Sequence, residues 1–199
     1  GKHSQEMASL AMGVLNQVPY ASDPRTEQWV SDVVDVMPKV GVTCCLLAFF
    51  GNGDIQGDRG KQDEVIRRLK KVAPRAAAAG VVLGIESWMN ADEHLRILDA
   101  VDSPAVKVYY DVANMTTRGY DVGREIRQLG KDRICQMHMK ENGQLLGRGK
   151  VDFPRVKEAV EDIGYRGWLI LEGATVPDKS LIECYKINRD FLRELFEIS

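Results

Sequence analysis

Residues 81–111, VVLGIESWMNADEHLRILDAVDSPAVKVYYD, contain one strand–helix–strand unit and decide the fold class. The apolar runs Val81–Ile85 and Val106–Tyr110 predict two strands, and their continuous hydrophobicity is typical of strands that are buried on both faces. Between them, Asn90 followed three residues later by Glu93 predicts a helix start, because these side chains satisfy free backbone N–H groups there. The unit therefore predicts a parallel sheet covered by helices.

The same alternation continues on both sides of this unit. Four more apolar runs predict strands, at Met7–Leu15, Val42–Phe50, Ile134–Met139 and Trp168–Leu171. Asp152 marks the start of another helix and Gly164 its end, and a final helix is expected over 178–196. Pro74 lies inside a long helical segment, so a kink or a division into two helices is expected there.

Six strands at intervals of about 25 to 40 residues are typical of a (β/α)8 barrel rather than of a two-domain enzyme. A complete barrel takes about 250 residues, whereas this chain has 199. We therefore predict an α/β fold, an incomplete (β/α)8 TIM barrel with about six βα units, in which residues 1–199 form a single domain that lacks the first two units. An open doubly wound sheet is the alternative, although no GxGxxG motif follows a strand and no dinucleotide site is expected. An incomplete barrel has two bare sheet edges. Pairing of these edges with a partner chain, including a homo-oligomer, therefore stays open.

Composition argues against several classes of function. The 27 Lys and Arg residues are outnumbered by 29 Asp and Glu residues, for a net charge of −2, so no nucleic-acid partner is expected. No apolar run approaches the roughly 18 residues of a membrane span, and the first residues lack a signal-peptide core. The four cysteines show no CxxC spacing, which favours reduced thiols. We therefore expect a cytoplasmic protein with no membrane partner.

Four of the six predicted strands end in a residue that binds hard divalent cations: Glu86, Asp111, His138 and Glu172. The C-terminal ends of parallel barrel strands meet on one rim, so these side chains are expected to be neighbours. Three carboxylates held close together repel one another unless a cation compensates them. Two Glu, one Asp and one His suit Mn²⁺ best, with Mg²⁺, Co²⁺ or Zn²⁺ as alternatives. The pattern predicts one divalent metal ion bound by these four residues.

Four segments resemble the motifs of xylose isomerase-like sugar isomerases and epimerases: GIES (84–87), YDVAN (110–114), MHMKE (137–141) and LEG (171–173). The resemblance runs from Met7 to about Phe196. It implies the same four metal ligands. As in the ketose epimerase branch of that family, it also implies that Glu86 and Glu172 are the paired catalytic acid and base.

The resemblance implies a divalent-metal-dependent sugar or sugar phosphate isomerase or epimerase, of the ketose/aldose isomerase or ketose 3-epimerase type, with a sugar or polyol substrate. A metal on the ketose oxygens stabilises the enediolate that forms when an adjacent C–H proton leaves, and the two glutamates remove and return the proton. A keto-sugar or inosose dehydratase or lyase needs the same groups and stays open, as does a non-catalytic barrel fragment. The related apurinic-site endonucleases use three zinc ions and many histidines, whereas only His3, His94 and His138 occur in this chain.

Four further residues are candidates for substrate binding: Trp88, Asn114, Lys140 and Arg148. Lys140 resembles the family's HxK element, which reaches a substrate oxygen or phosphate. Asn114 stands where several epimerases have a His in a DxxH pattern, which leaves the reacting carbon open. Arg148 falls where related chains place a loop near the substrate, and Trp88 is expected to form part of the pocket wall. A solvent-facing or core position is the alternative for each.

Overall fold

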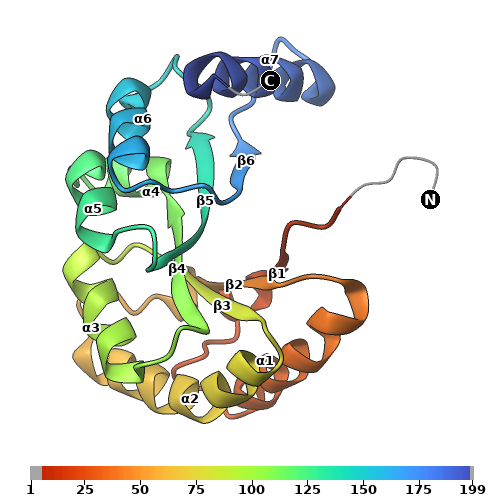
Figure 1. Cartoon of the computed structure of the whole chain (residues 1–199), viewed down its shortest axis with the longest axis vertical. Helices are drawn as coiled ribbons and strands as arrows, with labels where there is room; N and C mark the ends of the chain where they lie inside the picture. Colours follow the sequence, from red (N-terminus) through yellow and green to blue (C-terminus); the bar gives the residue numbers. More distant parts are fainter. Residues whose placement is uncertain (1–5, 198–199) are drawn as a thin grey trace. The chain divides into compact units, whose positions relative to one another are not determined.

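In the computed structural model the chain divides into two compact units, Gly1–Tyr109 and Tyr110–Ser199 (Figure 1). The structure describes residues 6–197. Each of the six predicted strands is present, and within each unit the strands are parallel neighbours in chain order. The prediction of strands alternating with helices is therefore confirmed. The expectation of a single domain stays a prediction.

The first unit is built on four strands: β1 (Leu10–Met12), β2 (Cys44–Phe49), β3 (Val82–Ser87) and β4 (Val106–Asp111), the last of which continues into the second unit. Every residue of β2 is buried, as are all but the first of β3. Continuous apolar sequences of this kind are expected where both faces of a strand are covered. The first strand is shorter than predicted, because the chain turns at Gly13 into the 3₁₀ helix η1 (Gly13–Asn16), which buries Leu15.

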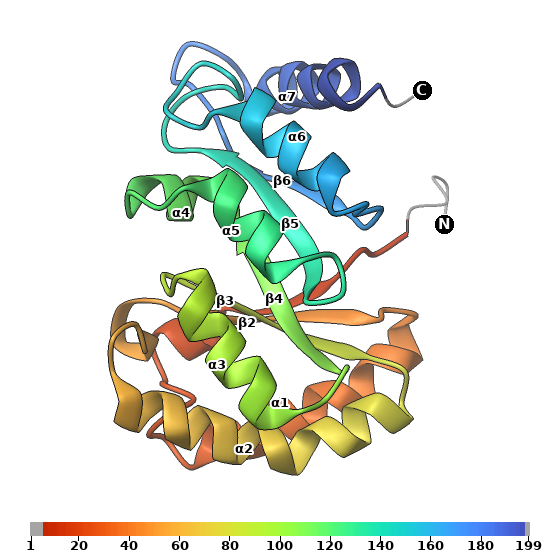
Figure 2. The ribbon, with the colours of Figure 1, turned by 60° about the vertical axis from the view of Figure 1, so that its left-hand side comes forward.

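Three helices, α1 (Arg25–Val36), α2 (Arg59–Ala78) and α3 (Ala91–Val101), lie along one face of these strands (Figure 2). Two more 3₁₀ turns, η2 (Met37–Val40) and η3 (Gly51–Gly53), complete the connections. The expected division of α2 at Pro74 is wrong, because α2 is one helix that contains this proline. The buried side of α2 continues past Pro74 with Ala76. The packing of this side stabilises the helix by more than the loss of the one hydrogen bond that a proline removes.

The predicted start of α3 is confirmed. Asn90 Oδ1 accepts a hydrogen bond from Glu93 N at 2.9 Å, and Glu93 Oε2 accepts one from Asn90 N at 3.4 Å. In the same turn His94 is buried, with Nδ1 3.0 Å from the carbonyl oxygen of Asn90 and Nε2 3.0 Å from Ser87 Oγ. Burial, which disfavours the charged ring, lowers the pKa of His94 to about 4, against the opposing effects of the Asn90 carbonyl and the Glu93 charge.

The buried imidazole of His94 is expected to make folding pH-dependent. The unfolded chain takes up a proton near pH 6.5 and the folded chain only near pH 4. The free energy of unfolding is therefore expected to fall as the pH drops from 6.5 to 4, by up to roughly 3 kcal/mol. NMR titration of the His94 ring measures its pKa in the folded chain. Urea unfolding at pH 7 and pH 4.5 measures the change in the free energy of unfolding.

His94→Gln is the control, because glutamine keeps one donor and one acceptor but does not titrate. The stability of wild type relative to this variant should decrease with falling pH. A His94 ring that titrates near pH 6.5 in the folded chain would contradict the prediction.

The second unit adds strands β5 (Ile134–Glu141) and β6 (Leu169–Gly173) and the helices α4 (Val112–Thr117), α5 (Val122–Leu129), α6 (Phe153–Asp162) and α7 (Leu181–Phe196). Helices α5 and α6 lie side by side (Figure 2). The predicted helix after Asp152 is confirmed, and Gly164 follows its end with a left-handed φ of 65°. The final helix begins at Leu181, later than predicted, because Ser180 and Glu183 form a capping box there.

The remaining sequence-based expectations concern the cysteines and the membrane. All four cysteines are free thiols, as predicted, and Cys44, Cys45 and Cys184 are buried. Among the helices within residues 6–197, none has the length and apolar character needed to cross a membrane.

Candidate metal centre

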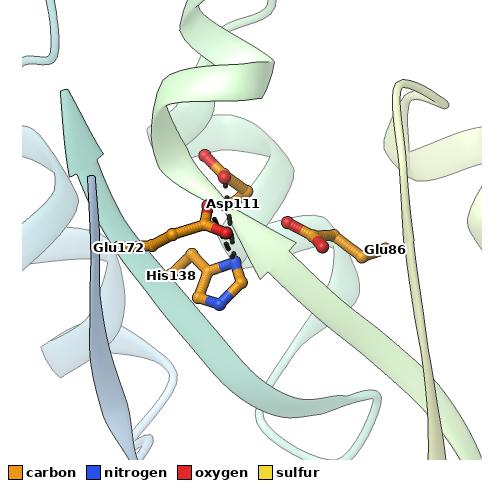
Figure 3. A group of neighbouring side chains, drawn as sticks. All are labelled: Glu86, Asp111, His138 and Glu172. Atoms are coloured by element: carbon orange, nitrogen blue, oxygen red, sulfur yellow. Dashed lines mark ion pairs between the residues drawn. The ribbon is translucent and has the colours of Figure 1, made fainter. Parts of the chain in front are cut away.

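Three of the four predicted metal ligands meet in the second unit, where Asp111 ends β4, His138 lies in β5 and Glu172 lies in β6 (Figure 3). One donor atom of each lies within 4.8 Å of the others. His138 Nδ1 is 3.8 Å from Asp111 Oδ2 and 3.5 Å from Glu172 Oε2. Donor atoms that share one small cation at about 2.1 Å stand roughly 3 to 4 Å apart. The spacing therefore fits ligands around a single ion.

Asp111 is held by the start of α4. Its Oδ1 accepts hydrogen bonds from the backbone N–H groups of Ala113 and Asn114, both at 2.8 Å. Its Oδ2 is buried and accepts no hydrogen bond within the described residues. Burial raises the pKa of Asp111, although the charge of Lys140 opposes this effect. A buried carboxylate oxygen without a hydrogen bond is costly unless a cation compensates it. The Lys140 ammonium group, 3.4 Å from this oxygen, is one such cation, and a metal ion would take its place there.

Lys140 supplies positive charge to this cluster. It lies opposite Glu172 in the register of β5 and β6. Its Nζ donates a hydrogen bond to Glu172 Oε2 at 2.8 Å and forms an ion pair with Asp111 Oδ2 at 3.4 Å. Burial alone would raise the pKa of Glu172, but the Lys140 hydrogen bond and the His138 charge outweigh it, so this pKa is lowered. A divalent ion would compete with the ammonium group for the same oxygens. The predicted substrate contact of Lys140 stays a prediction.

Two predicted site residues belong to the first unit. Glu86 is the penultimate residue of β3 and is 5% exposed; Figure 3 draws it with the three residues above. Trp88 follows β3, is half-buried, and packs edge-to-face against Phe50 with ring centroids 5.2 Å apart. Both lie at the C-terminal end of β3, as the sequence predicts, and their roles stay predictions.

The other two predicted substrate residues lie in the second unit. Asn114 is half-buried in the first turn of α4, where its backbone N–H donates to Asp111. Arg148 is exposed in the loop that joins β5 to α6. A role in substrate binding stays a prediction for both.

Glu141 organises the loop that carries Arg148, and sequence reasoning missed it. Its side chain is buried and accepts hydrogen bonds from Lys150 N and Val151 N, both at 3.1 Å. Gly149 lies so close that a Cβ atom there would overlap the Glu141 carboxylate. An acidic residue directly after Lys140 at a strand end was the available signal. Successive strand residues point to opposite faces, so Glu141 faces away from the Lys140 side chain.

Acidic and imidazole donors at or near the C-terminal ends of β4, β5 and β6 define a βα protein of the barrel class with a candidate metal site. The family is shown by comparison with known proteins. A family model for the xylose isomerase-like TIM barrel matches residues 12–195, and the chain belongs to this family.

Sugar 3-epimerases are among the relatives of this chain. A D-psicose 3-epimerase of Enterocloster bolteae is 27% identical over 155 residues, which cover 73% of this chain and 50% of that protein. A putative L-ribulose-5-phosphate 3-epimerase of Escherichia coli is 28% identical over 186 residues, which cover 82% of this chain and 65% of that protein. The chain thus spans between half and two-thirds of the length of these relatives.

The fold is shown by a solved L-ribulose 3-epimerase structure. It superposes with a TM-score of 0.81 at 20% identity, over 95% of this chain and 74% of that one. The predicted fold class, an incomplete (β/α)8 barrel with six strands in this chain, is confirmed.

Proposed function

We propose that this chain carries the metal-binding and proton-transfer groups of a divalent-metal-dependent epimerase that acts at carbon 3 of a ketose or ketose phosphate. The observation that carries the proposal is the cluster of Asp111, His138 and Glu172, with one buried Asp111 oxygen that accepts no hydrogen bond within the described residues. The 3-epimerase relatives support the choice of reaction.

The proposed ligands are these three residues and Glu86, the penultimate residue of β3. Carboxylate oxygens with one imidazole are suited to Mn²⁺, and Mg²⁺, Co²⁺ and Zn²⁺ are alternatives. The structure supports the three donors of the second unit through their spacing and through the buried Asp111 oxygen, which accepts no hydrogen bond within the described residues. Removal of the metal with a chelator is expected to abolish turnover.

A bound divalent ion would polarise the ketose carbonyl and stabilise the negative charge that develops when the neighbouring C–H proton leaves. Glu172 is the proposed base, because its carboxylate lies in the cluster, 3.5 Å from His138 Nδ1 and 2.8 Å from Lys140 Nζ, and a carboxylate is ionised near neutral pH. Glu86 is its proposed partner, which returns a proton to the opposite face of the same carbon. Lys140 holds one oxygen of Glu172 and so orients the other.

Proton exchange in D₂O tests this function. The purified chain with Mn²⁺ would be incubated with D-psicose, L-ribulose and L-ribulose 5-phosphate, and deuterium uptake would be followed by NMR. We expect deuterium at carbon 3 together with the 3-epimer. Glu172→Gln should lower the exchange rate by at least about 100-fold, the range that a positioned acid or base contributes.

The position of the label separates the alternatives. Deuterium at carbon 2 of an aldose product would indicate a ketose/aldose isomerase, and loss of a hydroxyl group would indicate a dehydratase or lyase. Mn²⁺ binding without any exchange would overturn the catalytic proposal and leave a non-catalytic metal-binding barrel fragment.

A further inference from the structure

Helix α7 buries a polar residue where an apolar one would be expected. Its buried residues are Cys184, Asn188 and Leu192, which are four apart and therefore form one stripe. Asn188, at the centre of this stripe, is 1% exposed. A carboxamide buried in this way is tolerated only when its donor and its acceptor are both used.

Both ends of the Asn188 carboxamide bind backbone groups of other segments. Its Oδ1 accepts a hydrogen bond from Leu146 N at 3.0 Å, and its Nδ2 donates one to the carbonyl oxygen of Ala174 at 2.7 Å. Leu146 lies in the loop after β5, and Ala174 directly follows β6. One side chain therefore joins the two segments that follow the strands carrying His138 and Glu172.

The backbone beside Glu172 needs such a restraint. Gly173 and Ala174 both have a left-handed backbone, with φ of 59° and 53°. This conformation is unfavourable for alanine, which has a Cβ atom, and it persists only where the surroundings hold it in place. Ala174 is 2% exposed, and its carbonyl is held by Asn188. Because Ala174 is two residues from Glu172, the same hydrogen bond limits how the Glu172 backbone can turn.

The neighbouring turn of α7 holds the other segment. Phe191, three residues after Asn188, lies so close to Gly147 that a Cβ atom at Gly147 would be 2.6 Å from its ring. Gly147 has a φ of 73°, and Leu146 beside it is buried. One face of α7 therefore fixes the loop after β5 by a hydrogen bond and by close ring packing.

We propose that Asn188 is a positioning residue of the metal centre. By joining the loop after β5 to the segment after β6, it holds Glu172 in the orientation in which its carboxylate faces His138 and Lys140. The inference rests on the proposed metal site, and it adds a residue from α7 that does not itself contact the cluster.

The test compares Asn188→Leu with Leu192→Ala. Leucine has the same branched skeleton as asparagine, with methyl groups in place of the amide atoms, and bonds neither backbone group, whereas Leu192→Ala disturbs the same buried stripe without touching these bonds. Mn²⁺ alone is the probe, titrated by calorimetry at a temperature at which circular dichroism shows both variants folded. Loss of an outer-shell partner typically weakens metal binding 10- to 100-fold. We expect at least about tenfold weaker Mn²⁺ binding for Asn188→Leu and a change within about twofold for Leu192→Ala.

A second measurement on the metal-free chain separates this inference from the proposed function. The backbone amide resonances of Glu172 and Gly173 should shift in Asn188→Leu and stay in place in Leu192→Ala. If the wild-type chain binds no Mn²⁺, the proposed function fails, and these resonances still decide the positioning role. Unchanged Mn²⁺ affinity or unchanged resonances in folded Asn188→Leu would overturn it. Asn188→Ser, whose hydroxyl is too short to join both segments, replaces Asn188→Leu if that variant does not fold.

Discussion

Asp111→Asn is expected to weaken Mn²⁺ binding by at least about 100-fold, or about 2.7 kcal/mol, while the chain stays folded. The amide oxygen of asparagine can still accept the hydrogen bonds that Oδ1 receives from Ala113 and Asn114. The position of Oδ2, however, would be taken by an NH₂ group, which donates hydrogen bonds and does not ligate a cation. The substitution therefore removes one ligand and one negative charge from the cluster without removing the helix cap.

Isothermal titration measures the Mn²⁺ affinity, and thermal unfolding followed by circular dichroism shows whether the chain stays folded. Asp152→Asn is the matched control, because Asp152 caps α6 through a hydrogen bond from Arg155 N and lies outside the cluster. It should bind Mn²⁺ as the wild type does. Equal Mn²⁺ affinity in Asp111→Asn and wild type would remove Asp111 from the proposed metal centre.

Gly53→Ala is expected to have the largest effect on stability, a loss of about 2 to 3 kcal/mol in the free energy of unfolding. A Cβ atom at Gly53 would overlap the carbonyl oxygen of Leu15 and lie 3.2 Å from its carbonyl carbon. These are backbone atoms of η1, and they cannot move aside as a side chain can. Leu15 is 0% exposed, and Asn16 Oδ1 accepts a hydrogen bond from Phe50 N at 2.9 Å, so η1 is tied to the end of β2.

Gly60→Ala is the same chemical change at a position with space. Gly60 lies in the first turn of α2, and a Cβ atom there would meet only Asp58 Oδ1 at 3.5 Å. Alanine favours helix over glycine, so this variant is expected to gain about 0.5 to 1 kcal/mol. Urea unfolding of both variants under identical conditions measures the difference. A Gly53→Ala chain as stable as the wild type would show that η1 and η3 can separate without cost.

The positions of the strands could be predicted from local sequence alone. A run such as Val106–Tyr110 is apolar at nearly every residue, and burial on both faces is the usual environment that tolerates such a run. The caps of α3 and α6 were equally predictable, because Asn90 and Asp152 act on backbone groups within three residues. Pro74 does not divide α2, because the packing of the whole helix acts against the local penalty of a proline.

The approach of Asp111, His138 and Glu172 could also be predicted, since parallel strands bring their C-terminal ends to one edge. The hydrogen-bond and ion-pair partners of these side chains could not be predicted. Lys140 pairs with Glu172 because of the register between β5 and β6, and register depends on contacts between strands.

The sequence by itself determined where strands occur and which of them carry metal-binding groups at or near their C-terminal ends, because these features depend on neighbours along the chain. Only the tertiary structure decided that Asn188 joins two segments 42 and 14 residues away, and that Glu141 turns to a loop rather than to the cluster. The physical reason is that a buried polar group takes whichever partner the packing brings within hydrogen-bonding distance, and distance in space is not encoded by spacing in sequence.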